Sequence, residues 1–217
     1  MRKVLSAIAI TTVAFLSMTG ASLAQRKAEP GTFDYYVLSL SWSPTHCAKN
    51  QGEADPDQCG VERKFGFIVH GLWPQYSNGG YPATCTRDRT VPRAVVDATM
   101  PVMPSVGLIV HQWTKHGTCT GLPVSDYFAQ LRTAFGKVKI PEALQAPNPD
   151  LSIPATQVER LFVKANPGLE PESVALVCSK RDVAEVRLCL NKELSFIPCG
   201  AKVVDRCRRD AMLTAAP

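Results

Sequence analysis

Several common sequence features are absent from this chain, and each absence argues against a class of protein. After the N-terminal region, no apolar stretch is long enough to span a bilayer, which argues against an integral membrane protein. No two cysteines form a C-x-x-C pair, which argues against zinc ribbons and thioredoxin-like redox sites. No G-x-S-x-G motif is present, which argues against hydrolases that carry a serine nucleophile on that turn. Internal repeats and low-complexity segments are also absent.

The N-terminus carries an apolar run from Val4 to about Leu16, which follows the basic pair Arg2-Lys3. Ser22-Leu23-Ala24 comes next, and small residues at this spacing fit cleavage by a signal peptidase. The alternative is a membrane anchor, but the run is short for a bilayer span. We therefore expect residues 1–24 to be a signal peptide and the mature protein to be periplasmic or secreted.

All eight cysteines lie after the expected signal peptide. An even number of cysteines in an exported chain predicts disulfides, here four of them. Spacing alone does not decide which cysteines are joined. The eight are Cys47, Cys59, Cys85, Cys119, Cys178, Cys189, Cys199 and Cys207.

The chain is mildly basic. Its formal net charge is +5, which becomes +3 when the two basic residues of the expected signal peptide are removed. This balance suits a polyanionic substrate without requiring one. A basic cluster near the C-terminus is either a solvated tail or a phosphate-binding surface. Its members are Lys202, Arg206, Arg208 and Arg209.

Local patterns over residues 25–217 predict a single α+β domain with a core at about 33–207. Strands lie at both ends and helices in the middle, without the regular alternation of a parallel α/β fold. The first predicted elements are a strand at 33–42, a loop at 43–62, a strand at 65–70 ended by Gly71 and Pro74, and helices at 92–117, interrupted by Pro101 and Pro104 and capped by Gly117. After these come a helix at 125–137 capped by Ser125, a connector at 141–154, a helix begun by the capping box Thr156–Glu159, and strands at 174–178, 185–190 and 194–199.

Three of the four histidines fall in two short segments. The segments are His70-Gly-Leu-Trp73-Pro74 and His111-Gln-Trp-Thr-Lys115-His116-Gly117. A lone histidine is more often a satisfied polar group in a core than a catalytic residue. Three histidines grouped with a lysine and two tryptophans favour a catalytic site instead.

The second segment gives one polar face when it is drawn on a helical wheel. His111, Gln112, Lys115 and His116 share this face, and Trp113 falls on the other side, where it can pack inward. Two histidines five residues apart cannot bind one metal ion as an i, i+4 pair would. We therefore expect no metal and no cofactor; a zinc hydrolase is the alternative, and it would require activity that a chelator abolishes.

The remaining chemistry has two imidazoles and a cation but no nucleophile supplied by the protein. This set suits RNA cleavage, because the ribose 2′-hydroxyl can attack the adjacent phosphorus when a base takes its proton. An acid must protonate the departing 5′-oxygen, and a cation must stabilise charge on the phosphoryl oxygens. Histidine can do both proton transfers near neutral pH. DNA lacks the 2′-hydroxyl, so we expect it to be left intact.

Two segments closely resemble the active-site segments of the ribonuclease T2 family. They are Phe67-Ile-Val-His70-Gly-Leu-Trp73-Pro74 and His111-Gln-Trp-Thr-Lys115-His116-Gly-Thr-Cys119. The resemblance runs over about 33–207 and includes Ser41-Trp42-Ser43-Pro44 and Glu185-Val-Arg-Leu-Cys189. It implies a central antiparallel sheet flanked by helices, and cleavage through a 2′,3′-cyclic phosphate with low base specificity.

The resemblance also implies disulfide pairs and the roles of individual residues. His116 corresponds to the base and His70 to the acid, while His111 holds phosphate and Lys115 stabilises the transition state. Trp73 and Tyr81 are expected to stack on a base, although Trp73 could be core and Tyr81 loop surface. The implied disulfides are Cys47–Cys59, Cys85–Cys119, Cys178–Cys207 and Cys189–Cys199.

Gln112 departs from the family pattern, in which Glu usually stands at this position. Gln donates a hydrogen bond without titrating, so we expect Gln112 to face solvent, bind phosphate and support catalysis. The expected partner is RNA, with no DNA, no membrane after signal cleavage and a monomeric protein. A non-catalytic RNA-binding or toxin-like protein is the alternative, and Gln112 is the feature that favours it.

Overall fold

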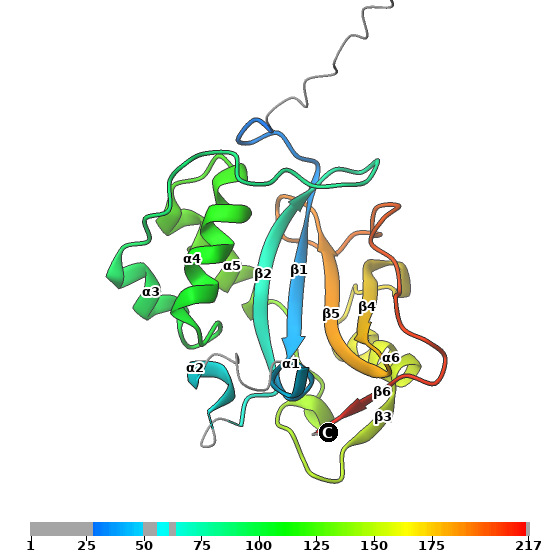
Figure 1. The fold of residues 1–217 in the computed structure, drawn as a ribbon. Helices are drawn as coiled ribbons and strands as arrows, with labels where there is room; N and C mark the ends of the chain where they lie inside the picture. The colour runs from blue at the N-terminus through cyan, green and yellow to red at the C-terminus, as the bar shows by residue number, and fades with distance from the viewer. Residues whose placement is uncertain (1–27, 50–55, 61–63, 216–217) are drawn as a thin grey trace, which may run out of the picture.

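A six-stranded sheet with helices around it forms the fold of the computed structural model (Figure 1). The structure describes residues 28–49, 56–60 and 64–215, so the expected signal peptide lies outside it. This arrangement confirms the α+β prediction. The strands are β1 (Tyr35–Trp42), β2 (Phe67–Gln75), β3 (Ser152–Pro154), β4 (Val174–Ser179), β5 (Asp182–Leu190) and β6 (Met212–Thr214).

The sheet is mostly antiparallel. Its order is β2-β1-β5-β6-β3, with β4 also paired to β5. The short β6, which the sequence patterns missed, pairs with β5 in the parallel direction at one position, Asp182 opposite Met212. The long strands are therefore antiparallel, as the resemblance implies. The complete sheet is mixed, because β6 is parallel to β5.

Helices α3, α4 and α5 lie beside β2, whereas α6 lies by β4 (Figure 1). Prolines separate α3 from α4 as predicted, and the Ser105 side chain caps α4 by accepting a hydrogen bond from the Leu108 amide. In the part of the chain that the structure describes, no helix is long and apolar enough to cross a membrane. The helices are α1 (Ser43–Lys49), α2 (Pro56–Cys59), α3 (Arg93–Thr99), α4 (Val106–Lys115), α5 (Val124–Gly136) and α6 (Ala155–Ala165), with short 3-10 turns η1 (Gly117–Cys119), η2 (Glu142–Leu144) and η3 (Pro171–Ser173).

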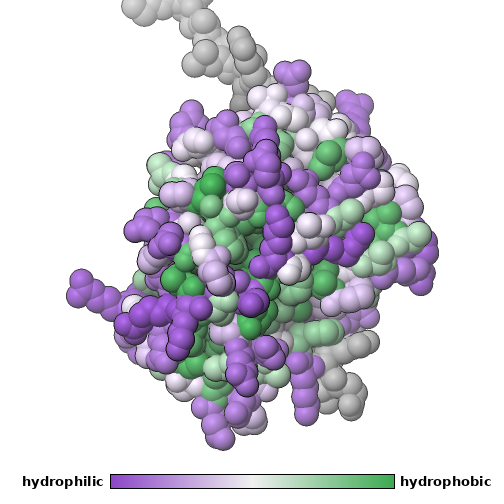
Figure 2. Space-filling view, turned by 180° about the vertical axis from the view of Figure 1, so that it is seen from behind, coloured by the Kyte–Doolittle hydropathy of each residue, from purple (hydrophilic) through white to green (hydrophobic). Residues whose placement is uncertain are grey.

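The two faces of the sheet differ in what they bury. Leu38, Leu40 and Trp42 of β1 point into the main core. Val37 points to the other face, where a small cluster packs against Trp73. Alternation along one strand therefore separates the main core from the face that carries the site described below. The side of the molecule opposite to that in Figure 1 is mainly hydrophilic, with hydrophobic patches between the polar side chains (Figure 2).

Strand β2 is longer than predicted, because Gly71 and Pro74 do not end it. Ser39 pairs with Gly71 and Leu40 with Val69, so His70 is an extra residue at a β-bulge. β2 lies at the edge of the sheet, where a strand tolerates the missing N–H of proline. The turn residues that predicted a stop belong instead to a bulged edge strand.

Five other local predictions were wrong. The predicted loop at 43–62 contains α1 and α2. The predicted strand at 194–199 forms only an isolated bridge, because Leu194 has a left-handed backbone that interrupts the extended chain. The capping box does not form, since α6 begins after Pro154 without a side-chain cap. Gly117 does not cap the end of α4, because His116 occupies the C-cap and Gly117 starts η1. Ser125 does not cap α5, because it lies inside this helix, whose N-cap is Pro123.

The eight cysteines form four disulfides, and none of them is free. The pairs are the same as those that the resemblance implies. They are Cys47–Cys59, Cys85–Cys119, Cys178–Cys207 and Cys189–Cys199.

Candidate active site

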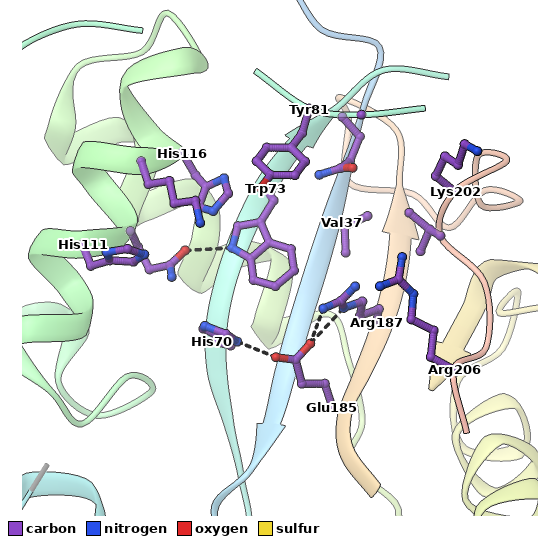
Figure 3. A pocket seen from close by; sticks show the side chains of 15 residues that line it. Val37, His70, Trp73, Tyr81, His111, His116, Glu185, Arg187, Lys202 and Arg206 are labelled. Carbon is purple, nitrogen blue, oxygen red and sulfur yellow. Dashed lines mark hydrogen bonds and ion pairs between the residues drawn. The ribbon is translucent and has the colours of Figure 1, made fainter. Parts of the chain in front are cut away.

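A cavity of about 410 Å³ lies between α4 and the strands β2, β1 and β5 (Figure 3). Every non-cysteine residue that the sequence predicted for the site lines this cavity. They are His70, Trp73, Tyr81, His111, Gln112, Lys115 and His116. The structure thus brings together two segments about forty residues apart in the chain. It adds the unpredicted Glu185 and Arg187, and it adds Lys202 and Arg206 from the basic cluster near the C-terminus.

The β-bulge explains how β2 supplies two side chains to one cavity. In a regular strand, residues three apart point to opposite faces. The extra residue at His70 shifts the alternation of side chains by one position, so His70 and Trp73 lie on the same face and both line the cavity. Bulges often redirect side chains next to active sites in this way.

His70 is held by a carboxylate from β5. Its Nδ1 lies 2.8 Å from Oε1 of Glu185, and the side chain of His70 is 32% exposed. The other carboxylate oxygen, Oε2, accepts hydrogen bonds from Nε and Nη2 of Arg187 at 2.9 and 2.6 Å. Ser39 also donates to Oε2, at 3.2 Å. Both oxygens of Glu185 are therefore occupied, and its position is defined from several directions.

The charge state of Glu185 follows from these contacts. Burial alone raises the pKa of its carboxyl, but the hydrogen bond and charge of His70, with the charge of Arg187, outweigh burial and bring the pKa to about 2. The carboxylate is therefore ionised at neutral pH and can only accept. Nδ1 of His70 must carry the hydrogen, so any proton that this ring gives to a substrate comes from Nε2.

Helix α4 supplies the polar face expected from the helical wheel. His111, Gln112, Lys115 and His116 line the cavity, and Trp113 packs in the core against Tyr127. The predicted division of this helix into a site face and a core face is confirmed. His111 is exposed, and its pKa is lowered by partial burial and by the charges of Lys115 and His70.

His116 differs from His70 in having no acidic partner. It is 5% exposed, and its buried Nδ1 has no hydrogen-bond partner among the described residues. Burial, followed by the charges of Lys115, His111 and His70, lowers the pKa of His116 to about 3. His116 is therefore neutral near pH 7 and can accept a proton, whereas His70 hydrogen-bonds the carboxylate of Glu185.

Trp73 lies between the two histidines. Its ring centroid is 5.3 Å from that of His116 in a stacked arrangement and 5.1 Å from that of His70 in an edge contact. The guanidinium of Arg187 lies over the same ring at 5.1 Å. A base that stacked on Trp73 would have to replace one of these contacts. Tyr81 is 48% exposed and lies 5.6 Å from His116, so it offers the more open ring. Base stacking stays a prediction for both residues.

Gln112 does not face solvent as expected, since it is 1% exposed. Its Oε1 accepts a hydrogen bond from Nε1 of Trp73 at 2.7 Å. Gly71 lies directly against this pair, and a Cβ there would overlap both the Gln112 oxygen and the Trp73 nitrogen. Gln112 therefore positions Trp73, a role that the helical wheel could not reveal because its partner comes from β2. Direct phosphate binding by Gln112 stays a prediction.

Gln112→Glu is expected to shift the pH profile of activity towards higher pH. The carboxylate could still accept the Trp73 hydrogen bond, but it would add a buried negative charge on the helix face that carries His116. That charge favours protonated His116 and raises its pKa, so the neutral base would appear only at higher pH. The measurement is kcat/KM against pH for a dinucleotide in both forms. Superimposable profiles would show that residue 112 does not influence His116.

Glu185 and Arg187 are the main residues that sequence reasoning missed as site members. Residues two apart in a strand share a face, and these two are polar in a strand that is otherwise apolar at Val186, Leu188 and Leu190. The sequence shows this alternation, but it does not show that Glu185 lies against His70 of β2. Within the described residues, no three His, Cys, Asp or Glu side chains are grouped as ligands for one metal ion.

Comparisons with known proteins show the family and the fold of this chain. The model of the ribonuclease T2 family matches residues 33–199. A ribonuclease of Aeromonas hydrophila is 42% identical over 183 residues, which cover 80% of this chain and 79% of that protein. Ribonuclease MC1 from bitter gourd seeds has a TM-score of 0.66 at 22% identity and covers 84% of this chain and 100% of its own. RNase NT in complex with 5′-AMP has a TM-score of 0.60 at 21% identity and covers 80% of this chain and 98% of its own. The two solved structures bear on the fold, and the family model and the Aeromonas relative bear on the family: the chain belongs to the ribonuclease T2 family.

Proposed function

We propose that this protein is a metal-independent endoribonuclease that cleaves RNA through 2′,3′-cyclic phosphate intermediates. The observation that carries the proposal is the asymmetry of two histidines in one cavity. His70 hydrogen-bonds an ionised carboxylate, while His116 is buried without an acidic partner. The ring of His116 is thus favoured in its neutral, basic form, and the ring of His70 is held through Nδ1 so that Nε2 can serve as the acid.

The reaction needs only the substrate and these side chains. His116 accepts the proton of the ribose 2′-hydroxyl, whose oxygen then forms a bond to the adjacent phosphorus. The bond from phosphorus to the 5′-oxygen breaks, and Nε2 of His70 protonates that oxygen. Lys115 and His111 lie beside His116 and stabilise negative charge on the phosphoryl oxygens. Low base specificity follows if Tyr81 provides a stacking surface, since every base has a face that can stack.

The location and assembly of the enzyme complete the proposal. Residues 1–24 act as a signal peptide, and residues 25–217 form a single ribonuclease domain that works as a monomer in the periplasm or outside the cell. The basic and apolar N-terminus and the four disulfides support export. The substrate is RNA, and DNA is spared because it has no 2′-hydroxyl.

RNA cleavage is expected to survive an excess of EDTA and to leave single- and double-stranded DNA intact. The two proton transfers and the charge stabilisation all come from side chains, so chelation removes nothing that the reaction uses. In the measurement, purified protein is incubated with RNA in excess EDTA, and the cleavage products are examined for cyclic-phosphate ends. Loss of cleavage on chelation, with recovery on addition of Zn²⁺ or Mg²⁺, would contradict the proposal and favour the zinc hydrolase. RNA binding without cleavage would favour the non-catalytic alternative.

A further inference from the structure

The basic cluster near the C-terminus divides into two parts in the structure. Lys202 and Arg206 line the active-site cavity, opposite α4 (Figure 3). Arg208 instead pairs with Asp210 at 3.3 Å, and neither Arg208 nor Arg209 lines the cavity. The sequence left open whether this cluster is a solvated tail or a phosphate-binding surface. In the structure, Lys202 and Arg206 fit the second alternative, and Arg208 and Arg209 fit the first.

The segment that carries Lys202 and Arg206 is anchored at both ends. Cys199 is bonded to Cys189 of β5, and Cys207 is bonded to Cys178 of β4. Between them, the Arg206 amide donates to the Leu176 carbonyl at 2.8 Å. The Lys202 side chain packs over Gly79, where a Cβ would overlap it. Two disulfides and these contacts hold both cations at the rim of the cavity.

The positive charges of this rim are not neutralised within the described part of the chain. Neither Lys202 nor Arg206 forms an ion pair there. The carboxylate of Asp205, between them in sequence, accepts a hydrogen bond from the Leu176 amide at 2.7 Å. Glu185 is the only carboxylate among the described lining residues, and His70 and Arg187 already bind it. An anion at this rim would therefore meet cations whose hydrogen-bonding groups are available.

The direction of the RNA chain follows from the proposed function, on which this inference rests. The nucleoside whose 2′-hydroxyl attacks lies at His116 beside Tyr81, and the leaving 5′-oxygen lies at His70. Lys202 lies beyond Tyr81 and Trp73, on the side away from His111 (Figure 3). Its end of the cavity is therefore where the chain continues on the 5′ side of the attacking nucleoside.

We infer that Lys202 and Arg206 form a binding site for the phosphate on the 5′ side of the nucleotide that is cleaved. The ligand class is a phosphodiester or a terminal 5′-phosphate of RNA. The site makes the enzyme favour polymeric or 5′-phosphorylated RNA over a bare dinucleoside monophosphate. Arg187 stands beside the site, but its bonds to Glu185 assign it to the positioning of that carboxylate.

The test compares NpN with its 5′-phosphorylated form pNpN in the wild type, in K202Q/R206Q and in R208Q/R209Q. Two contacts from cations to one phosphate should raise kcat/KM for pNpN about tenfold over NpN in the wild type. The cavity variant should lose this preference through KM and retain cleavage of NpN. R208Q/R209Q carries the same change in net charge and should keep the preference. The single conservative variants K202R and R206K should keep it as well.

A binding measurement separates this inference from the proposed function. The 2′-deoxy forms of NpN and pNpN cannot react, so their Kd values report the phosphate contact without turnover. A preference for the phosphorylated ligand that needs Lys202 and Arg206 supports the site even if no RNA were cleaved. The inference is overturned if cleavage is normal but K202Q/R206Q keeps the preference, or if R208Q/R209Q loses it equally. It is also overturned if the variant instead loses a preference for a phosphate on the 3′ side, as in NpNp.

Discussion

Replacing either His70 or His116 by alanine is expected to lower kcat for RNA cleavage by about 10²- to 10⁴-fold, the usual contribution of a general acid or base. Binding of a 2′-deoxy dinucleotide should persist, because Lys115 and Tyr81 remain in place. The double variant should be little worse than either single variant, since both residues act on one concerted step. A single variant with nearly normal kcat would remove that residue from the mechanism.

A substrate with a good leaving group separates the acid from the base. A nucleoside 3′-aryl phosphate releases a phenolate that needs no proton, but its 2′-hydroxyl still needs a base. His70→Ala should therefore recover most of its activity on the aryl substrate, and His116→Ala should not. Recovery in the His116 variant instead would reverse the assignment that burial of His116 and the carboxylate at His70 support. The control is the wild type on both substrates.

The predictable parts of the site were those defined within a single element. The helical wheel placed His111, Lys115 and His116 on one face because helical periodicity alone decides that. Trp113 packs inward for the same reason. Similarly, the prolines between α3 and α4 broke the helix as expected, because proline lacks an N–H and clashes with the preceding turn.

The parts that failed depend on partners from distant elements. Whether Pro74 ends a strand depends on whether that strand is at an edge, which the local sequence does not show. The bulge at His70 exists only relative to β1. Gln112 was expected to face solvent because the wheel shows the helix without β2, and Trp73 covers it. The roles of Lys202 and Arg206 likewise depend on two disulfides that bring their segment to the cavity.

The role of Glu185 also depends on a partner from a distant element, because it lies on β5 and contacts His70 of β2. Its substitution tests whether this contact supports catalysis. Glu185→Gln is expected to lower kcat at neutral pH by about 10- to 100-fold, a part of what general acid catalysis supplies. The amide keeps the size of the side chain but loses the negative charge that lies against His70. It also cannot accept hydrogen bonds on both of its terminal atoms, so either His70 or Arg187 loses its acceptor. Glu185 does not touch the substrate in this scheme and acts as a positioning residue for His70.

The pH profile distinguishes this role from a structural one. The substitution removes a negative charge 2.8 Å from the ring that acts as the acid, so the alkaline limb of kcat/KM should move to lower pH. Most of the lost activity should return on the nucleoside 3′-aryl phosphate, which does not need the acid. Asp182→Asn, the same change on the same strand outside the cavity, should leave profile and kcat unaltered. A drop in kcat with an unmoved profile and no recovery would mean that Glu185 only supports the shape of the cavity.

Acid unfolding gives an independent check on the same carboxylate. The pKa of Glu185 is lowered to about 2 from an ordinary value of 4.5, so the folded protein binds this proton less readily than the unfolded chain. The ionised carboxylate therefore contributes stability that is present above about pH 4.5 and is lost as pH falls towards 2. Glu185→Gln lacks a titrating group there, so its free energy of unfolding should fall less steeply over that range than that of the wild type. Equal slopes in a comparison of denaturant unfolding at pH 5 and pH 3 would show that the ion pair with His70 and Arg187 does not stabilise the folded state.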